Sequence, residues 1–228
     1  MLSSPSDADT DAGLETARLL LDIKAVNFRP EEPYTLTAGW ASPVYIDCRW
    51  VISFPEARRR IIQLACEKLD RDVGFNTVDA VAGGETAGIP YAAWIAEAEA
   101  KPMLYVRKKP KGFGRNAQIE GTFDEGQRVL LVEDLATDGG SKITFVDALR
   151  QAGGEVTDIF VVFFYGAFPG AEKSMEKMGV NLHFLATWRD VLKVAEEGQY
   201  FNQAAIDGVR AFLDDPVAWS KGHGGRGD

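Results

Sequence analysis

The chain has few of the side chains that most often build metal centres and covalent catalytic sites. Its 228 residues include two cysteines and two histidines. Cys48 and Cys66 have neither CxxC nor other metal-ligand spacing, so we expect both to be buried apolar fillers in a reducing, cytoplasmic environment. His183 and His223 leave little material for a zinc site or a histidine-based triad. The sequence therefore points away from disulfide-stabilised and zinc-dependent proteins.

Positive charge and long apolar runs are also scarce. The formal net charge is −9, which argues against general nucleic-acid binding because a phosphate backbone favours a basic surface. The longest apolar run, residues 159–168, is too short to span a bilayer and suits a buried strand. The acidic first eleven residues lack the apolar segment of a signal peptide. We therefore expect a cytoplasmic protein with neither nucleic-acid nor membrane partners.

What is present is the pattern of a globular α/β protein. Hydrophobic residues make up 46% of the chain and charged residues 26%, which is typical of a soluble domain. From residue 78 onward, short apolar runs alternate with segments of helical periodicity, and this alternation predicts a doubly wound, mostly parallel sheet. The predicted strands are 78–82, 103–106, 128–132 and 158–165, and the predicted helices are 89–100 and 142–152.

The N-terminal part of the chain predicts a small cap on this sheet. Residues 34–39 and 43–47 are predicted as the two strands of a small hairpin. Helices are predicted at 14–26 and 54–69, the second with Pro55 at its start.

We expect a single domain with loose ends. Residues 1–11 are predicted to be disordered, residues 12–221 to form the domain, and residues 222–228 to be a loose tail. The domain is predicted to consist of an N-terminal helix and hood (12–70), a core (71–189) and a C-terminal helical region (190–221).

The most informative segment of the sequence is 129–142. Four apolar residues lead into Glu133 and Asp134, and a turn of small and hydroxyl residues follows before the predicted helix. Backbone N–H groups at such a turn, with the positive end of the next helix, form an anion site. Taken alone, the two acids could simply cap the turn. Beside an anion site they are suited to sugar hydroxyls, so the segment predicts a sugar-phosphate ligand.

Two further segments are expected at the same edge of the sheet, where parallel strands end and ligands bind. The glycines of 83–88 would let the backbone approach a diphosphate; the alternative is an ordinary strand-to-helix turn with Thr86 as N-cap. Residues 107–115 contain five cations and no acid, and Gly112 and Gly114 add backbone freedom. Such a loop can close over a polyphosphate, whereas the alternative is a solvated basic turn. Together the segments favour a ligand with two phosphate groups.

These residues resemble the type I phosphoribosyltransferases. The motif with which that family binds phosphoribosyl pyrophosphate (PRPP) has four apolar residues, two acids, two variable residues, then Thr and a Gly/Ser-rich turn. Residues 129–141 match it closely. Within the superfamily the chain looks most like the orotate phosphoribosyltransferases. Two further matches carry that likeness: residues 42–47, and the series Arg107, Lys108, Lys111, Gly114 and Asn116.

The resemblance implies a pentosyltransferase of de novo pyrimidine (UMP) biosynthesis. Such an enzyme transfers ribose 5-phosphate from PRPP to N1 of orotate, giving orotidine 5′-phosphate and pyrophosphate. The resemblance implies Mg²⁺ as the cofactor, and it assigns no protein ligand to the metal. Because the basic loop of this family reaches into the neighbouring subunit's site, it also implies a homodimer with shared active sites.

The resemblance also assigns roles to individual residues. The turn 137–141 would bind the 5′-phosphate, the two acids would hold the ribose hydroxyls, and the basic loop would neutralise the departing pyrophosphate. Tyr45 and Thr137 would contact orotate. The catalytic residues would be Lys108, Lys111, Glu133 and Asp134. The residues that bind PRPP would be Gly83, Gly84, Arg107, Lys108, Lys111, Glu133, Asp134, Thr137, Asp138, Gly139, Gly140 and Ser141.

The chain departs from the family pattern at three places. Phe113 stands where the loop usually has a histidine, and Thr37 stands where many members have a lysine. No arginine follows the strand at 158–165, and Arg49 or Arg189 could supply the missing cation. These departures leave open a phosphoribosyltransferase for a purine or another base. The other alternative is a non-catalytic PRPP-binding regulator, which should lack the cationic loop or carry a separate basic DNA-binding module.

Overall fold

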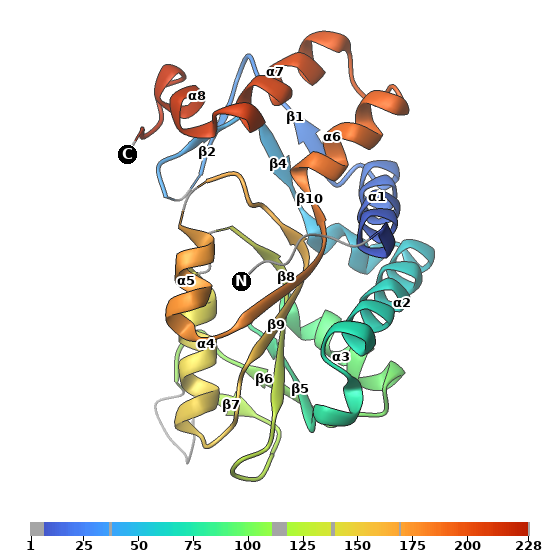
Figure 1. Ribbon diagram of the computed structural model, residues 1–228, viewed down its shortest axis with the longest axis vertical. Helices are drawn as coiled ribbons and strands as arrows, with labels where there is room; N and C mark the ends of the chain where they lie inside the picture. The colour runs from blue at the N-terminus through green and yellow to red at the C-terminus, as the bar shows by residue number, and fades with distance from the viewer. Residues whose placement is uncertain (1–6, 37, 111–117, 138–139, 169, 228) are drawn as a thin grey trace.

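The fold is built around a six-stranded sheet, seen near the centre of Figure 1. The computed structural model describes residues 7–36, 38–110, 118–137, 140–168 and 170–227, with the backbone alone at 140–141 and 171–172. The strand order is β10-β9-β8-β5-β6-β7, and all neighbours are parallel except β6 and β7. This order confirms the predicted doubly wound, mostly parallel sheet. The strands are β5 (Ala80–Gly84), β6 (Met103–Val106), β7 (Ile119–Glu120), β8 (Val129–Ala136), β9 (Asp158–Phe164) and β10 (Asn181–Thr187).

Helices cover both faces of the sheet. On one face pack α1 (Asp7–Asp22), α2 (Pro55–Asp72) and α3 (Gly88–Ala98), and on the other α4 (Gly140–Gln151) and α5 (Ala171–Met178) (Figure 1). Because both faces are covered, β9 is buried along its whole length, as expected of a central parallel strand. Its side chains join two hydrophobic cores, one beneath each layer of helices.

A smaller hood lies at the end of the sheet where β10 runs into the next helix, at the top of Figure 1. Two short antiparallel ladders contribute to it. The paired strands are β1 (Val26–Phe28) with β4 (Val44–Ile46), and β2 (Tyr34–Thr35) with β3 (Ala41–Ser42). The remaining elements are η1 (Cys48–Ser53), η2 (Phe75–Thr77), α6 (Trp188–Glu197), α7 (Gln203–Asp214) and α8 (Pro216–Gly222).

The predicted hairpin of residues 34–39 with 43–47 is wrong in its pairing. Strand β4 pairs with β1, which lies at the end of the segment predicted as the first helix. That helix stops at Asp22, and Lys24 takes a positive φ of 60°, which turns the chain toward the hood. The backbone N–H of Asp47 then donates to the carbonyl of Ala25 at 3.0 Å. Local periodicity identified the strands but not their partners.

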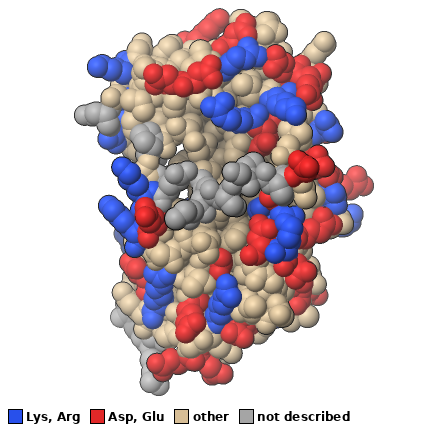
Figure 2. All heavy atoms as spheres, in the orientation of Figure 1, with Lys and Arg blue, Asp and Glu red and all other residues tan. Residues whose placement is uncertain are grey.

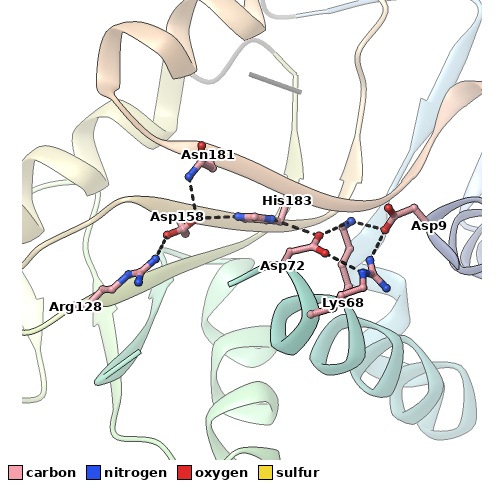
Figure 3. A network of polar contacts seen from close by, with 8 residues as sticks. Asp9, Lys68, Asp72, Arg128, Asp158, Asn181 and His183 are labelled. Carbon is pink, nitrogen blue, oxygen red and sulfur yellow. Dashed lines mark hydrogen bonds and ion pairs between the residues drawn. The ribbon is translucent and has the colours of Figure 1, made fainter. Parts of the chain in front are cut away.

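The N-terminal segment is ordered earlier than predicted. Helix α1 begins at Asp7, so disorder is wrong for residues 7–11, whereas residues 1–6 lie outside the described residues. Asp9 forms ion pairs with Lys68 at 2.6 Å and with Arg71 at 2.5 Å, both on α2. These charge-assisted contacts hold the first turn of α1 against α2 (Figure 3). A helix start secured by a distant helix has no local signal in the sequence.

The predicted loose tail is docked on the hood. The backbone N–H of Arg226 donates to the carbonyl of Gly39 at 2.9 Å, and its guanidinium lies 4.7 Å from the centre of the Trp40 ring. The buried hydroxyl of Ser220 accepts a hydrogen bond from the Ala41 N–H at 3.0 Å and donates to the Arg226 carbonyl at 2.7 Å. Glycine-rich composition therefore misled the prediction for 222–227, and Asp228 lies outside the described residues.

Besides the short η2, the prediction missed β7, α5 and β10 among the described elements of the core. β7 is two residues long and exists through its pairing with β6, so it carries no periodicity of its own. The others are α5, which is one short amphipathic helix, and β10, an edge strand whose burial pattern is mixed. Two predicted turns also begin later than expected. Gly83 and Gly84 lie within β5, and β8 continues past the two acids to Ala136.

The visible surface is mixed in charge. Figure 2 shows acidic and basic side chains interspersed over this face of the molecule. Nucleic-acid-binding proteins usually show clustered basic residues instead. In the part of the chain that the structure describes, no helix combines the length and apolarity needed to cross a membrane.

Candidate active site

The topology brings the predicted segments to one place. The order in which successive strands are added to the sheet reverses between the parallel neighbours β5 and β8: β5 leads through α3 to β6 on one side, and β8 leads through α4 to β9 on the other. Ligands of doubly wound sheets bind at such a switch point, beyond the carboxyl ends of the strands. A pocket of about 440 Å³ lies there. It is lined by Tyr45, Ile46, Asp47, Cys48, Arg49, Glu85, Thr86, Ala87, Lys108, Glu133, Asp134, Leu135, Thr137, Lys142 and Phe145.

A larger pocket of about 600 Å³ lies elsewhere, between α1, α2 and the edge strand β10. Several of its charged groups are paired with one another or with charged neighbours, as Figure 3 shows. Asp158 accepts from Arg128 at 2.7 Å, and Lys68 lies 2.8 Å from Asp72. His183 bridges the two groups, at 2.8 Å from Asp158 and 3.7 Å from Asp72. We interpret this network as structural, because these contacts join helices to strands, and we place the site in the smaller pocket.

Glu133 is the more deeply buried of the two predicted acids, with 6% of its surface exposed. Gly84 and Gly88 make room for its carboxylate. A Cβ on Gly84 would stand 1.8 Å from Glu133 Oε1, and one on Gly88 would stand 2.9 Å from the same atom. Burial raises the pKa of Glu133 to about 7. Its Oε1 atom has no hydrogen-bond partner in the part of the chain that the structure describes.

Lys142 is the site residue that the sequence reasoning missed. It lies in the first turn of α4, and its ammonium donates to the carbonyl of Leu135 at 2.6 Å and lies 3.6 Å from Glu133 Oε2. Lys142 is 5% exposed. A cation near a helix N-terminus opposes the helix dipole, and that mismatch is the signal that could have identified it.

Asp134 and Thr137 line the pocket as predicted. Asp134 is partly buried, and this burial raises its pKa above the ordinary value of an aspartate. Helix α4 begins at Gly140, so the positive end of its dipole faces the end of this turn. Gly140 and Ser141 are described by their backbone alone, and Asp138 and Gly139 lie outside the described residues.

The segment that follows β5 lines the pocket, whereas the predicted glycines at the end of the strand do not. Glu85, Thr86 and Ala87 line the pocket, whereas Gly83 and Gly84 are buried within the strand. Helix α3 has Ala87 at its N-cap position, so the alternative of Thr86 as N-cap is wrong.

Three cations of the basic segment, Arg107, Lys108 and exposed Lys109, lie in the described part of the chain, and the first two differ in position. The backbone N–H of Lys108 donates to Glu85 Oε2 at 2.8 Å, and Lys108 lines the pocket. Arg107 directly follows β6, and its Nε donates to Glu120 of the neighbouring strand β7 at 3.0 Å. Lys111, Phe113 and the rest of 111–117 lie outside the described residues.

The hood supplies the opposite wall of the pocket. The Tyr45 ring is 37% exposed, and its centre lies 5.3 Å from that of Tyr34. Arg49 also lines the pocket and makes two hydrogen bonds to Asp47, at 2.6 and 2.7 Å. Arg189 donates to the carbonyl of Leu213 and lines the other pocket. Of the two arginines considered as replacements, Arg49 is therefore the one at the site.

Comparison with known proteins identifies the family, although no family model matches the chain. An orotate phosphoribosyltransferase of Sinorhizobium medicae is 54% identical over 211 residues, which cover 92% of this chain and 91% of the relative. The chain belongs to the orotate phosphoribosyltransferase family. An enzyme of the same name from Rhizobium meliloti is 51% identical over 223 residues, covering 96% of each chain. Members of this family are pentosyltransferases, and the chain is an enzyme of this class.

Solved structures of orotate phosphoribosyltransferases share the fold. The enzyme of Aeropyrum pernix superposes with a TM-score of 0.69 at 32% identity, covering 82% of this chain and 99% of that one. The enzyme of Mycobacterium tuberculosis, solved in complex with PRPP, has a TM-score of 0.60 at 29% identity. That match covers 80% of this chain and 98% of the other. The type I phosphoribosyltransferase fold inferred from the motif is confirmed.

Proposed function

We propose that the pocket between β5, β8 and the hood binds PRPP and orotate and is where this orotate phosphoribosyltransferase works. In the reaction, the bond from ribose C1 to pyrophosphate breaks and a bond from C1 to orotate N1 forms. One observation carries the assignment. A single pocket at the switch point of the sheet gathers Tyr45, Lys108, Glu133, Asp134 and Thr137, which are distant in the sequence.

The 5′-phosphate of PRPP fits the turn between β8 and α4. Thr137 lines the pocket, and α4 starts at Gly140, so N–H groups and the positive end of the helix dipole are directed at this turn. We include Asp138, Gly139 and Ser141 in this phosphate site because of the sequence motif. In this arrangement the 5′-phosphate is bound after β8, away from the carboxylates of Glu133 and Asp134 within the strand.

The two acids suit the ribose. Asp134 borders the pocket and can accept hydrogen bonds from ribose hydroxyls, and Glu133 lies beneath it with Oε1 unpaired among the described residues. Carboxylates in a poorly solvated site also stabilise positive charge strongly. Because positive charge develops on the ribose as pyrophosphate leaves, we assign both acids to the transition state.

Pyrophosphate would leave toward Lys108 and the turn after β5. Lys108 already lines the pocket, and we propose that the basic loop of the neighbouring subunit brings its Lys111 to the same pyrophosphate. Arg107 would take part by exchanging Glu120 for a phosphate oxygen, since its guanidinium currently donates to that carboxylate. Gly83 and Gly84 would act indirectly in this arrangement, because they shape the end of β5 beneath the turn.

Mg²⁺ fits this chemistry as a partner of the substrate. Within the described residues no group of three or more carboxylate, histidine or cysteine side chains forms a ready-made metal site. Mg²⁺ characteristically keeps several waters and binds largely through substrate phosphates. We therefore propose that it enters on the pyrophosphate group of PRPP, where it neutralises charge on the leaving group.

Orotate is assigned to the hood side of the pocket. Tyr45 and Thr137 lie on the pocket wall, and the partly exposed Tyr45 ring offers an aromatic surface to a planar base. Arg49 lines the same pocket and can supply a cation for the orotate carboxylate by releasing Asp47. The missing lysine and arginine of the family pattern are thereby replaced by a single residue.

We further propose that the enzyme is a cytoplasmic homodimer with shared active sites. The likeness of the 107–115 segment to the loop that reaches between subunits in this family supports the dimer. Two free cysteines, both buried, are compatible with a reducing compartment.

A direct assay tests this assignment. Consumption of orotate is followed by its ultraviolet absorbance in the presence of PRPP and Mg²⁺, with adenine, guanine and uracil as control bases. We expect turnover with orotate alone. Turnover with a purine alone would overturn the base assignment, and no PRPP-dependent turnover with any base would overturn the catalytic role of the pocket.

A further inference from the structure

The side chain of Lys142 reaches back across the phosphate turn, the segment between β8 and α4, from its end to its beginning. The residue belongs to the first turn of α4, yet its ammonium donates to the carbonyl of Leu135 near the end of β8 at 2.6 Å. The same ammonium lies 3.6 Å from Glu133 Oε2. Both side chains are more than nine-tenths buried. A buried charge is costly to desolvate, so a charge held there needs specific partners.

We propose that Lys142 is a positioning residue of the phosphoribosyl site, which fixes the geometry of the phosphate turn and keeps Glu133 ionised. This inference rests on the proposed function of the pocket, in which Glu133 acts as an anion beside the ribose. Lys142 itself touches the carbonyl of Leu135 and the carboxylate, and it acts on the substrate through them.

The charges that face Glu133 come from three elements. Lys142 on α4 and Lys108 after β6 favour its ionised form, whereas Asp134, the next residue of β8, disfavours it. The side facing β5 and α3 offers Gly84 and Gly88, which bring no charge and leave space for the carboxylate. Burial is the largest influence, and with Lys142 present it raises the pKa of Glu133 to about 7.

Removal of Lys142 should change the pKa of Glu133 in a definite direction. Lys142 lowers the pKa of Glu133, so its loss raises that pKa further and leaves the carboxyl protonated at neutral pH. A neutral carboxyl neither stabilises developing positive charge on the ribose nor accepts hydroxyl hydrogen bonds as strongly as a carboxylate. Activity that requires ionised Glu133 should therefore be displaced to higher pH.

The test measures kcat/KM for PRPP between about pH 5.5 and 9. In Lys142→Met the acidic limb should move up by about one pH unit or more, with a loss of kcat/KM at pH 7 of about fivefold or more. Lys142→Arg should retain most of the wild-type profile because it keeps the charge. Lys193→Met, on an exposed position of α6, serves as a matched control and should leave the profile unchanged.

A second measurement separates positioning from simple loss of stability. NMR of protein labelled with ¹³C at the glutamate carboxyls gives the pKa of Glu133 directly, with Glu133→Gln used to assign the signal. Lys142→Met should raise this pKa, and Lys142→Gln repeats the experiment should the methionine variant fold poorly. This readout needs no turnover, so it stands even when the catalytic assay contradicts the proposed function.

An unmoved acidic limb together with an unmoved Glu133 pKa would overturn the proposal. So would a Lys142→Arg variant that behaves like Lys142→Met, because a retained charge would then have no effect. A lowered Tm with an unchanged pH profile would show that Lys142 is merely structural.

Discussion

At the scale of single residues, Glu133 and Asp134 are adjacent but differ in environment. Glu133 lies in a space that Gly84 and Gly88 leave open, whereas Asp134 is partly exposed at the pocket. The glycines after the predicted strand were interpreted as a close approach to a diphosphate. The structure shows that Gly84 makes a close approach to a carboxylate of the protein instead.

Gly84→Ala tests this account of the glycine. Its Cβ would stand 1.8 Å from Glu133 Oε1 and 2.6 Å from the Phe145 ring, so side chains at the site must shift. We expect the free energy of unfolding to fall by about 1–3 kcal/mol and activity to fall with it. Urea unfolding measures the first and the orotate assay the second. Gly222→Ala is the control, because a Cβ there meets no neighbour among the described residues. Equal behaviour of the two variants would contradict the account.

Lys111→Ala tests the catalytic cation that the sequence motif assigns outside the described residues. Removing a well-placed contact to a developing charge typically costs about 10²–10³ in rate, and we expect kcat to fall in that range. Lys109→Ala, in the same segment and exposed, should have a much smaller effect. An unchanged rate in Lys111→Ala would remove this lysine from the mechanism.

At the scale of elements, short segments are held by distant partners. Strand β3 and helix α8 are far apart in the chain, and the buried hydroxyl of Ser220 joins them by bonding Ala41 and Arg226. The first turn of α1 depends likewise on Lys68 and Arg71 of α2. Neither contact could be expected from the local pattern of hydrophobic residues.

Ser220→Ala should loosen the hood. The Ala41 N–H loses its partner in a buried place, and leaving a buried polar group unsatisfied costs about 1–3 kcal/mol, while the less buried Arg226 carbonyl loses a donor as well. We expect a lower Tm, and faster amide exchange confined to β3 and α8. Ser174→Ala is the matched control, because within the described residues that exposed hydroxyl bonds only the carbonyl of Gly170, the N-cap of its own helix. An equal change of Tm in both variants would mean that the Ser220 bridge contributes nothing specific.

The Asp158 network should make stability depend on acid pH. Although burial opposes it, hydrogen bonds from His183, Arg128, Thr157 and Asn181 together hold the pKa of Asp158 below its ordinary value. A depressed folded-state pKa stabilises the fold above the unfolded pKa of about 4, and this contribution is lost as pH falls through lower values. We expect the stability difference between wild type and Asp158→Asn to shrink as urea unfolding is repeated from pH 6 toward 3. A constant difference would contradict this account.

At the scale of the whole molecule, the switch point of the sheet decides where the chemistry occurs. It places the ends of β5 and β8 side by side and puts the hood over them. Lys108 of the same chain lines the pocket. In the proposed dimer, the remaining cations of the basic loop reach this pocket from the neighbouring subunit.

Mixing two inactive variants tests that sharing. Lys111→Ala removes the loop cation and Asp134→Asn removes a carboxylate at the pocket. If the loop of one subunit serves the pocket of the other, a mixed dimer contains one pocket that lacks neither group. We expect activity to return to a fraction of wild type after subunit exchange. Absence of recovery after exchange has been verified, for example by mass spectrometry of the mixed dimer, would contradict shared sites.

The periodicity of the chain was sufficient to predict four strands of the sheet, β5, β6, β8 and β9, and the helices α3 and α4 between them. Strand β6 was predicted with its observed bounds, and the run 128–132 became the first part of β8. Part of the pocket wall was also predicted from the sequence, because Glu133, Asp134 and Thr137 lie near the carboxyl end of a predicted strand. Local pattern does not identify pairing partners, which is why the hood ladders, β7 and β10 were missed or misassigned.

The sequence by itself determined the strand–helix rhythm, the motif at 129–141 and, through them, the likeness to phosphoribosyltransferases, because each depends on neighbours in the chain. Only the tertiary structure decided which cation accompanies which acid. Lys142 reaches Glu133, Lys108 faces the pocket, Arg107 pairs with Glu120 and Arg49 pairs with Asp47. These contacts depend on burial and on distances across the fold, and both arise when separate segments pack together.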